Sequence, residues 1–124
     1  MLNREQNLGQ SGENIAAEFL TQNGYKILER NYRCLYGEID IIARAQEVLV
    51  FVEVKTRTSI AYGSPASAIT PRKQRQISKT AQHYLAAKNL FDTPARFDVV
   101  SICIGFKQKP EIELLTNAFD LYEG

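Results

Sequence analysis

The sequence predicts a single α/β domain built on a central mixed five-stranded sheet flanked by helices. Three observations lead to this class: a helical period in two segments, a strongly apolar segment at residues 48–55, and the order helix, three strands, helix, two strands. With 124 residues, 44% of them apolar and 23% charged, the chain can build one hydrophobic core but not two. We therefore expect one domain over residues 1–124.

The first half of the chain is expected to form one helix and three strands. Ser11 is a suitable N-cap, and Asn23 with Gly24 is expected to end the helix. Its apolar stripe consists of Ile15, Ala16, Phe19 and Leu20. Strands are predicted over residues 25–32, 38–44 and 48–55. The last two form a hairpin, because only a tight connection near residues 45–47 separates them.

The second half is expected to add a helix and two strands. Thr70 as N-cap and Pro71 as the first helical residue predict where this helix begins. Its buried stripe is Ile77, Ala81, Tyr84 and Leu85. Residues 58–69 contain several small residues and no charge, which predicts a long loop, and such loops are often functional. Strands over residues 97–104 and 112–115 complete the sheet.

Asp40, Glu53 and Lys55 are ionisable residues in two strands of the predicted hairpin that otherwise resemble buried core. Residues two apart on a strand face the same way, so Glu53 and Lys55 share a face. A loop of two or four residues places Asp40 opposite Glu53 and Glu38 opposite Lys55, whereas a three-residue loop separates the two acids. Removing such groups from water costs on the order of several kcal/mol each, so a core strand that carries them usually serves a function.

Two carboxylates that face each other on a sheet repel unless a positive charge lies between them. Mg2+ or Mn2+ resolves this conflict, because hard cations take oxygen ligands. With Lys55 beside them, the acids suit phosphodiester hydrolysis, in which a metal lowers the pKa of water and an ammonium group neutralises developing charge. The alternative is structural: Glu38 and Lys55 form an exposed cross-strand ion pair, and Asp40 and Glu53 lie near solvent at strand ends.

Basic residues are concentrated in one stretch of the chain. Residues 55–91 carry seven Lys and Arg and no Asp or Glu, a net charge of +7, while the remainder has eight basic and fourteen acidic residues, a net charge of −6. A stretch of one sign indicates a surface for a polyanion, because phosphate contacts supply most non-specific affinity for nucleic acids. The candidate contacts are Arg57, Arg72, Lys73, Arg75 and Lys79. The alternative is a solvated helix face.

These residues carry a family resemblance. An Asp at the end of one strand, then an acid-x-Lys on the next, with a helical Glu before and a basic helix after, resembles the PD-(D/E)XK nuclease superfamily with its restriction-endonuclease-like fold. A longer series of motifs is similar to the small bacterial YraN-like family of predicted nucleases, which resemble archaeal Holliday junction resolvases. That series is Gly12-Glu13, Gly24-Tyr25, Asn31-Tyr32-Arg33, Gly37-Glu38-Ile39-Asp40, Phe51-Val52-Glu53-Val54-Lys55-Thr56-Arg57 and Arg96-Phe97-Asp98-Val99-Val100.

The resemblance implies roles for individual residues. Asp40 and Glu53 would bind the metal, the carbonyl of Val54 would add a ligand, and Lys55 would be the catalytic lysine. Glu13 matches a helical Glu that contributes to the metal site of resolvase-like members. The alternative is that Glu13 lies in the first helical turn and complements the helix dipole there. Ile39 stands where the name of the superfamily has proline.

We therefore expect a metal-dependent endonuclease that cleaves DNA, uses Mg2+ or Mn2+, and recognises branched or junction structure rather than sequence. The alternatives are a non-catalytic nucleic-acid-binding module, or an adaptor whose uncharged loop at residues 58–69 contacts a protein. Junction-cleaving relatives act as dimers, so the resemblance also implies a homodimer.

Other features of the sequence predict the localisation of the protein and the roles of a few further residues. The chain starts with polar residues and contains no run near the roughly 18 apolar residues of a membrane span, so we expect a cytoplasmic protein without a membrane segment. Cys34 and Cys103 are expected to be reduced, without a catalytic role. His83 is expected on a helix surface. Arg96 and Asp98 share a strand face, where a structural ion pair and a functional role both stay open.

Overall fold

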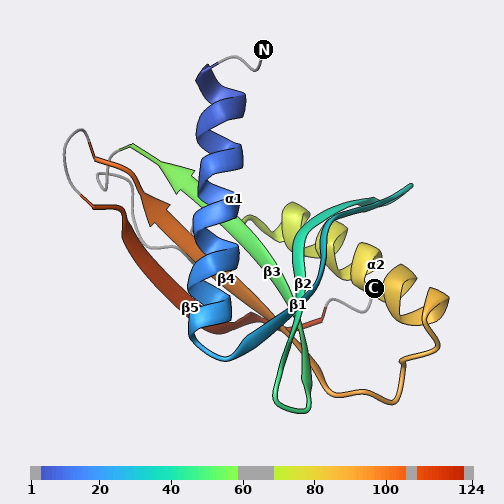
Figure 1. The fold of residues 1–124 in the computed structure, drawn as a ribbon. Coiled ribbons are helices and arrows are strands. Elements are labelled where there is room, and N and C mark those ends of the chain that lie inside the picture. The colour runs from blue at the N-terminus through green and yellow to red at the C-terminus, as the bar shows by residue number, and fades with distance from the viewer. Residues whose placement is uncertain (1–3, 59–68, 106–108, 122–124) are drawn as a thin grey trace.

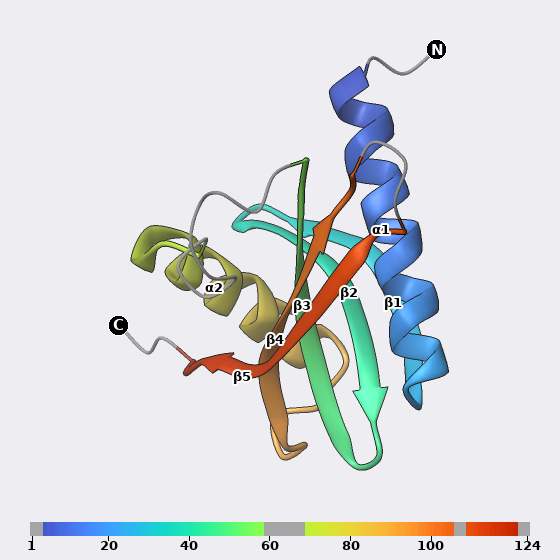
Figure 2. The same cartoon turned by 90° about the vertical axis from the view of Figure 1, so that its left-hand side faces the viewer.

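The computed structural model confirms the predicted class: two helices lie on opposite sides of one mixed five-stranded sheet (Figures 1 and 2). It describes residues 4–58, 69–105 and 109–121, with side chains from residue 11 onward. The helices are α1 (Arg4–Gln22) and α2 (Pro71–Ala87). The strands are β1 (Tyr25–Cys34), β2 (Gly37–Ala45), β3 (Val48–Arg57), β4 (Ala95–Cys103) and β5 (Glu111–Phe119). Neither described helix combines the length and apolar character needed to cross a membrane.

The strands lie side by side in chain order, β1-β2-β3-β4-β5. Pairs β1–β2, β2–β3 and β4–β5 are antiparallel, and β3–β4 is parallel. Helix α2 lies in the crossover connection that a parallel pair requires. Strands β2 and β3 pair up to Ala45 and Val48, which leaves Gln46 and Glu47 as a two-residue turn. The loop therefore has an even number of residues, which is the condition for Asp40 to lie opposite Glu53.

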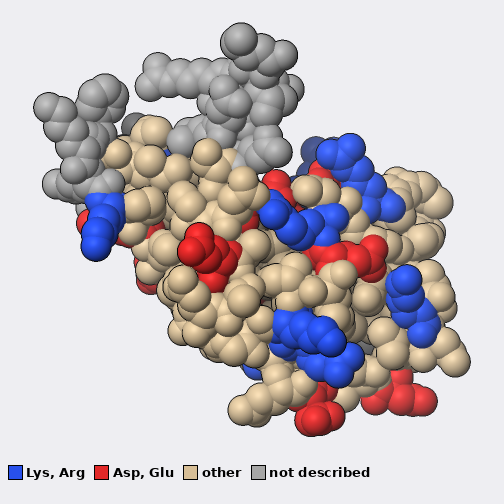
Figure 3. All heavy atoms as spheres, viewed as in Figure 1, with Lys and Arg blue, Asp and Glu red and all other residues tan. Residues whose placement is uncertain are grey.

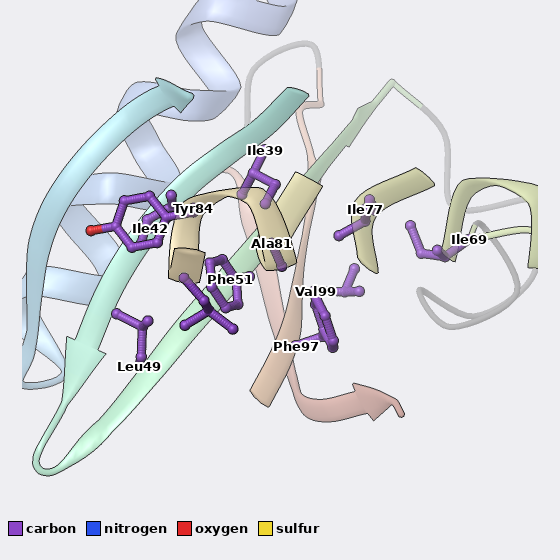
Figure 4. Packing of buried hydrophobic residues seen from close by; sticks show 11 residues of the cluster. Ile39, Ile42, Leu49, Phe51, Ile69, Ile77, Ala81, Tyr84, Phe97 and Val99 are labelled. Atoms are coloured by element: carbon purple, nitrogen blue, oxygen red, sulfur yellow. The ribbon is translucent and has the colours of Figure 1, made fainter. Parts of the chain in front are cut away.

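The side chains of the sheet form two apolar layers. Under α2, the core includes Ile39, Ile42, Phe51, Phe97 and Val99 (Figure 4). Under α1, it includes Ala16, Leu20, Ile41, Val50, Val52, Val100 and Ile102. The predicted stripe of α2 is buried throughout, as Ile77, Ala81, Tyr84 and Leu85. Each large apolar side chain buried in this way contributes about 1.5–3 kcal/mol, so both helices are held mainly by the sheet.

The start of α2 is confirmed. Thr70 is the N-cap, Pro71 follows it, and Thr70 Oγ1 accepts a hydrogen bond from the Lys73 amide at 3.2 Å. This cap fixes Lys73 in the first turn of the helix. Residues 59–68 of the predicted loop lie outside the described residues, and Ile69 at its end is buried in the layer under α2.

Several strands run further than the sequence predicts. β1 ends at Cys34, β3 at Arg57 and β5 at Phe119. In each case the strand continues because the neighbouring strand offers it a backbone partner, which outweighs local propensity. Cys34 and Cys103 are both free, as expected.

A buried charged network joins β1, β4 and β5. The carboxylate of Asp98, which is fully buried, accepts hydrogen bonds from Arg96 Nε at 3.0 Å, Tyr25 Oη at 2.9 Å and the Asn117 amide at 2.9 Å. Arg96 Nη2 also donates to Tyr25 Oη at 2.9 Å. Arg96 and Asp98 therefore form a structural ion pair, and their network holds the part of β5 beyond its predicted end.

The prediction of an N-cap at Ser11 is wrong, because α1 begins at Arg4 and Ser11 lies inside the helix. Gly12, the next residue of this helix, has a packing role. A Cβ atom at Gly12 would overlap with Oγ1 of Thr56 on β3. The missing side chain lets α1 lie directly against β3 and thereby positions the next residue, Glu13.

We predict that Gly12→Ala lowers the free energy of unfolding by about 1–3 kcal/mol, because the added methyl group must push α1 away from β3. Urea denaturation followed by circular dichroism measures the change. Adding Thr56→Ala should restore part of the loss, since it removes the overlapping Oγ1 atom. Ser11→Ala, on an exposed position of the same helix, is the matched control and should change stability by less than about 0.5 kcal/mol. Equal stabilities of Gly12→Ala and the control would contradict this account.

Candidate functional site

The candidate site lies where β2 separates from β3. Backbone pairing between these strands ends at Ile41 and Val52. Beyond that point the amide of Val54 donates a hydrogen bond to Asp40 Oδ2 at 2.8 Å. A side-chain carboxylate therefore takes the place of a main-chain acceptor, and this bond holds Asp40 between the two diverging strands.

Glu53 is the first residue of β3 beyond the last pair with β2, and it is only 7% exposed. Burial, followed by the negative charge of Asp40, raises the pKa of Glu53 from 4.5 to about 7. Burial also raises the pKa of Asp40, and the hydrogen bond from Val54 opposes that rise. The site is thus a pair of carboxylates that are costly to ionise together.

Two lysines lie near this pair. Lys73 Nζ is 3.8 Å from Glu53 Oε1. The positive charges of Lys55 and Lys73 lower the pKa values of both Asp40 and Glu53, against the effect of burial. Lys55 therefore lies where the sequence predicts. From the sequence, Lys73 is a candidate for phosphate contacts. In the structure its ammonium group forms an ion pair with Glu53. The N-cap at Thr70, which fixes the first turn of α2, was the only sequence signal for this position.

Glu13 lies at the border of the site, on α1. Burial and the charge of Asp40 raise the pKa of Glu13. Asn31 has a left-handed backbone (φ 55°), and with its amide nitrogen toward the acids it donates to Glu13 Oε1 and Glu38 Oε1, both at 3.0 Å. Arg30 Nη2 lies 4.0 Å from Glu13 Oε1. Because α1 begins at Arg4, Glu13 is not a first-turn acid, and the helix-dipole alternative is wrong.

The structural alternative for the hairpin acids is not observed. Glu38 pairs with Arg33 at 3.4 Å, and no ion pair between Glu38 and Lys55 is present in the described part of the chain. Glu53 is buried rather than near solvent at a strand end.

The remaining basic candidates lie outside the carboxylate pair. Arg57 Nη2 is 3.5 Å from Ser101 Oγ and is partly buried. Arg72, Arg75 and Lys79 are exposed on α2. On the face that carries α1, Lys and Arg are interspersed with Asp and Glu (Figure 3). A surface of one charge is therefore not found on that face, and α2 is the better candidate for a basic surface.

The donor set fits a hard divalent cation held by two carboxylates. Within the described residues, no three His, Cys, Asp or Glu side chains lie close enough to hold one ion, so Glu13 stands apart from Asp40 and Glu53. Every fully buried side-chain nitrogen or oxygen in those residues has a hydrogen-bond partner. Mg2+ typically uses one or two carboxylates and completes its shell with water and phosphate oxygens.

Comparison with known proteins identifies the family. The model of the uncharacterised protein family UPF0102 matches residues 12–102, so the chain belongs to this family. A UPF0102 protein of Geobacter sulfurreducens is 53% identical over 114 residues, which are 92% of this chain and 89% of that protein. A UPF0102 protein of Lachnoclostridium phytofermentans is 52% identical over 115 residues, which are 92% of this chain and 93% of that protein.

Similarity to solved structures is low. Pyrococcus furiosus SfsA, solved in complex with Ca2+, aligns with a TM-score of 0.40 and 13% sequence identity. The alignment covers 90% of this chain and 63% of the SfsA chain.

We predict that Glu53→Gln changes how stability depends on pH. Because the pKa of Glu53 is raised from 4.5 to about 7, the folded state holds its proton more tightly than the unfolded state, and the free energy of unfolding falls as pH rises through this window. Glutamine removes this loss, so the variant should be about 2 kcal/mol more stable than wild type at pH 8 and nearly equal to it at pH 4.5. Urea denaturation between these pH values measures the difference.

Glu47→Gln, at an exposed position in the β2–β3 turn, is the control and should follow the wild-type pH dependence. A Glu53→Gln variant with the same pH dependence as wild type would show that Glu53 titrates normally.

Proposed function

We propose that this chain, as a member of family UPF0102, is a metal-dependent nuclease that hydrolyses phosphodiester bonds of DNA. The observation that carries the proposal is the carboxylate pair, Asp40 and Glu53, at the point where β2 leaves β3. Among the described residues, only Lys73 forms a direct ion pair with either of them. A buried carboxylate beside a half-buried one is costly to ionise unless a cation joins them. The order of motifs that resembles the PD-(D/E)XK nucleases supports the same chemistry.

The residues divide the chemistry among them. Hydrolysis adds a water oxygen to phosphorus, breaks one P–O ester bond and passes a proton to the leaving oxygen. Asp40 and Glu53 would hold Mg2+ or Mn2+, which when bound lowers the pKa of water and offsets negative charge. Lys55 offsets the charge that develops on the phosphoryl oxygens. Lys73 favours the ionised form of Glu53, because its positive charge lowers the pKa of that carboxyl group.

The substrate contacts come from α2. Arg72, Arg75 and Lys79 are exposed along the helix whose first turn carries Lys73. Such contacts to phosphates position a nucleic acid without reading its sequence. Selectivity for branched DNA follows from the resemblance to junction resolvases, as does the homodimer that paired cuts would need.

We predict that Asp40→Asn, Glu53→Gln and Lys55→Met each lower DNA cleavage at least about 100-fold, because each removes a charge that the transition state needs. The assay incubates the full chain with branched, flapped and linear DNA in Mg2+ or Mn2+ and resolves products on denaturing gels. Branched DNA should be cut faster than linear DNA.

Glu47→Gln and Lys88→Met are matched controls at exposed positions outside the site, and both should retain cleavage within about twofold. Cleavage that survives all three site substitutions would contradict the assigned roles. Salt-sensitive DNA binding without any scission by the wild-type protein would instead indicate the non-catalytic module.

We also predict that Arg72→Gln/Arg75→Gln/Lys79→Gln weakens binding to all DNA sequences alike. The slope of log affinity against log salt should fall by about 3 in magnitude, since each phosphate contact contributes about 0.9. Fluorescence anisotropy with a linear duplex in EDTA measures it. Lys26→Gln/Lys88→Gln/Lys109→Gln removes the same charge from other exposed positions and should change the slope by less than about 1. Equal slopes of the two triple variants would locate the DNA elsewhere than on α2.

A further inference from the structure

The β1–β2 hairpin ends in an exposed apolar turn. Cys34 pairs with Gly37, so Leu35 and Tyr36 form a two-residue turn, and they are 85% and 43% exposed. Turns of this length usually consist of Gly, Asn or Asp, whose backbones suit them. The conformation of the turn therefore does not explain why a leucine and a tyrosine occupy it.

The turn is anchored on α2 through a series of rings. The Tyr36 ring lies 6.3 Å from the His83 ring in an edge arrangement, and His83 Nδ1 is 2.7 Å from Tyr32 Oη. Tyr32 in turn packs edge-on against the buried Tyr84 at 5.2 Å. His83 lies on the helix surface, as expected, and it links the turn to the core.

The backbone of the hairpin also approaches α2 closely. Gly37 has a φ of 150°, and a Cβ atom there would lie 3.0 Å from Cγ of Gln76. A larger residue at this position would lift the turn from the helix. The turn therefore has a well-packed base, and Leu35 projects from it.

The distance from the turn to the carboxylate pair is similar along β2 and along α2. Along β2, the five residues from Leu35 to Asp40 span at most about 17 Å. Along α2, the ten residues from Lys73 to His83 span about 15 Å. The exposed Arg75 and Lys79 lie between those two positions. A phosphate chain that follows α2 would therefore pass from the turn to the site in four to five nucleotides, at about 3.4 Å per nucleotide.

We propose that Leu35 and Tyr36 insert at the unstacked base step of a DNA branch point, while the adjoining strand follows α2 to Asp40 and Glu53. This inference rests on the proposed nuclease function and names the structure that the site recognises. Apolar side chains that wedge into a base step and aromatic rings that stack on bases are established modes of nucleic-acid recognition.

The surroundings of the turn favour DNA over other occupants. The side chain of Arg33 beside the turn is 75% exposed although it pairs with Glu38, and Lys79 lies one helical turn before His83. A base step offers an apolar face together with phosphates for these cations. A stable dimer needs about 800 Å2 from each partner, and a membrane surface needs an extended apolar face, so two side chains among cations suit neither.

The test compares wild type with Leu35→Ser/Tyr36→Ser. The probes are a four-way DNA junction with 2-aminopurine at the branch and a linear duplex of equal length, both in EDTA. The variant should lose at least about tenfold of the junction-over-duplex preference, because stacking on one base is worth 1–3 kcal/mol. Its duplex affinity should stay within about twofold, and the rise in 2-aminopurine fluorescence should disappear.

Phe91→Ser is the matched control, since Phe91 is 63% exposed in the α2–β4 connection, and it should keep the preference. An unchanged preference in the double variant, an equal loss on duplex, or a wild type without any preference would each overturn the proposal. A lower mass of the double variant alone in sedimentation equilibrium would also overturn it, in favour of contact between copies. These measurements need no cleavage, so a wild type that binds junctions but cuts no DNA refutes the nuclease and leaves the branch contact standing.

Discussion

The hydrogen bond from the Val54 amide to Asp40 is the constraint on which the rest of the site depends. Two strands of a sheet can separate inside a protein only if their freed N–H and C=O groups find other hydrogen-bond partners. Asp40 supplies that acceptor, at 2.8 Å, just beyond the last β2–β3 pair. The separation leaves the Glu53 side chain beside Asp40 and frees the β1–β2 hairpin to reach α2, where Gly37 meets Gln76. This bond thus lies where the carboxylate pair and the departing hairpin begin.

The sequence predicted those parts that local signals determine. The cap at Thr70 and the apolar stripe place α2 correctly, because capping and helical period act within a few residues. The facing of Asp40 and Glu53 follows from parity once the loop is known to have two residues, since a slip by one residue would turn every side chain to the other face.

The parts that sequence could not predict depend on how elements dock. Lys73 reaches Glu53 because the first turn of α2 lies beside Glu53 on β3. The sequence of the helix alone does not predict this placement. Glu38 pairs with Arg33 because β1 and β2 stay together after β2 leaves β3. Asn31 bridges two acids only through an unusual backbone angle. The sequence does not show that Gly12 makes room for β3, because this depends on how α1 docks on the sheet.

The buried carboxylates of Asp98 and Glu53 differ in their hydrogen-bond partners, and this difference bears on function. Asp98 accepts bonds from Arg96, Tyr25 and the Asn117 amide on its two oxygens, which offsets the cost of burying its charge. Glu53 has the Lys73 ammonium at 3.8 Å, which is too far for a hydrogen bond, and it faces a second acid. Within the described residues, three donors thus compensate the carboxylate of Asp98, whereas the cation paired with Glu53 lies beyond hydrogen-bond distance. A cation bound between Asp40 and Glu53 would add to the compensation that the Val54 amide and Lys73 give to these acids.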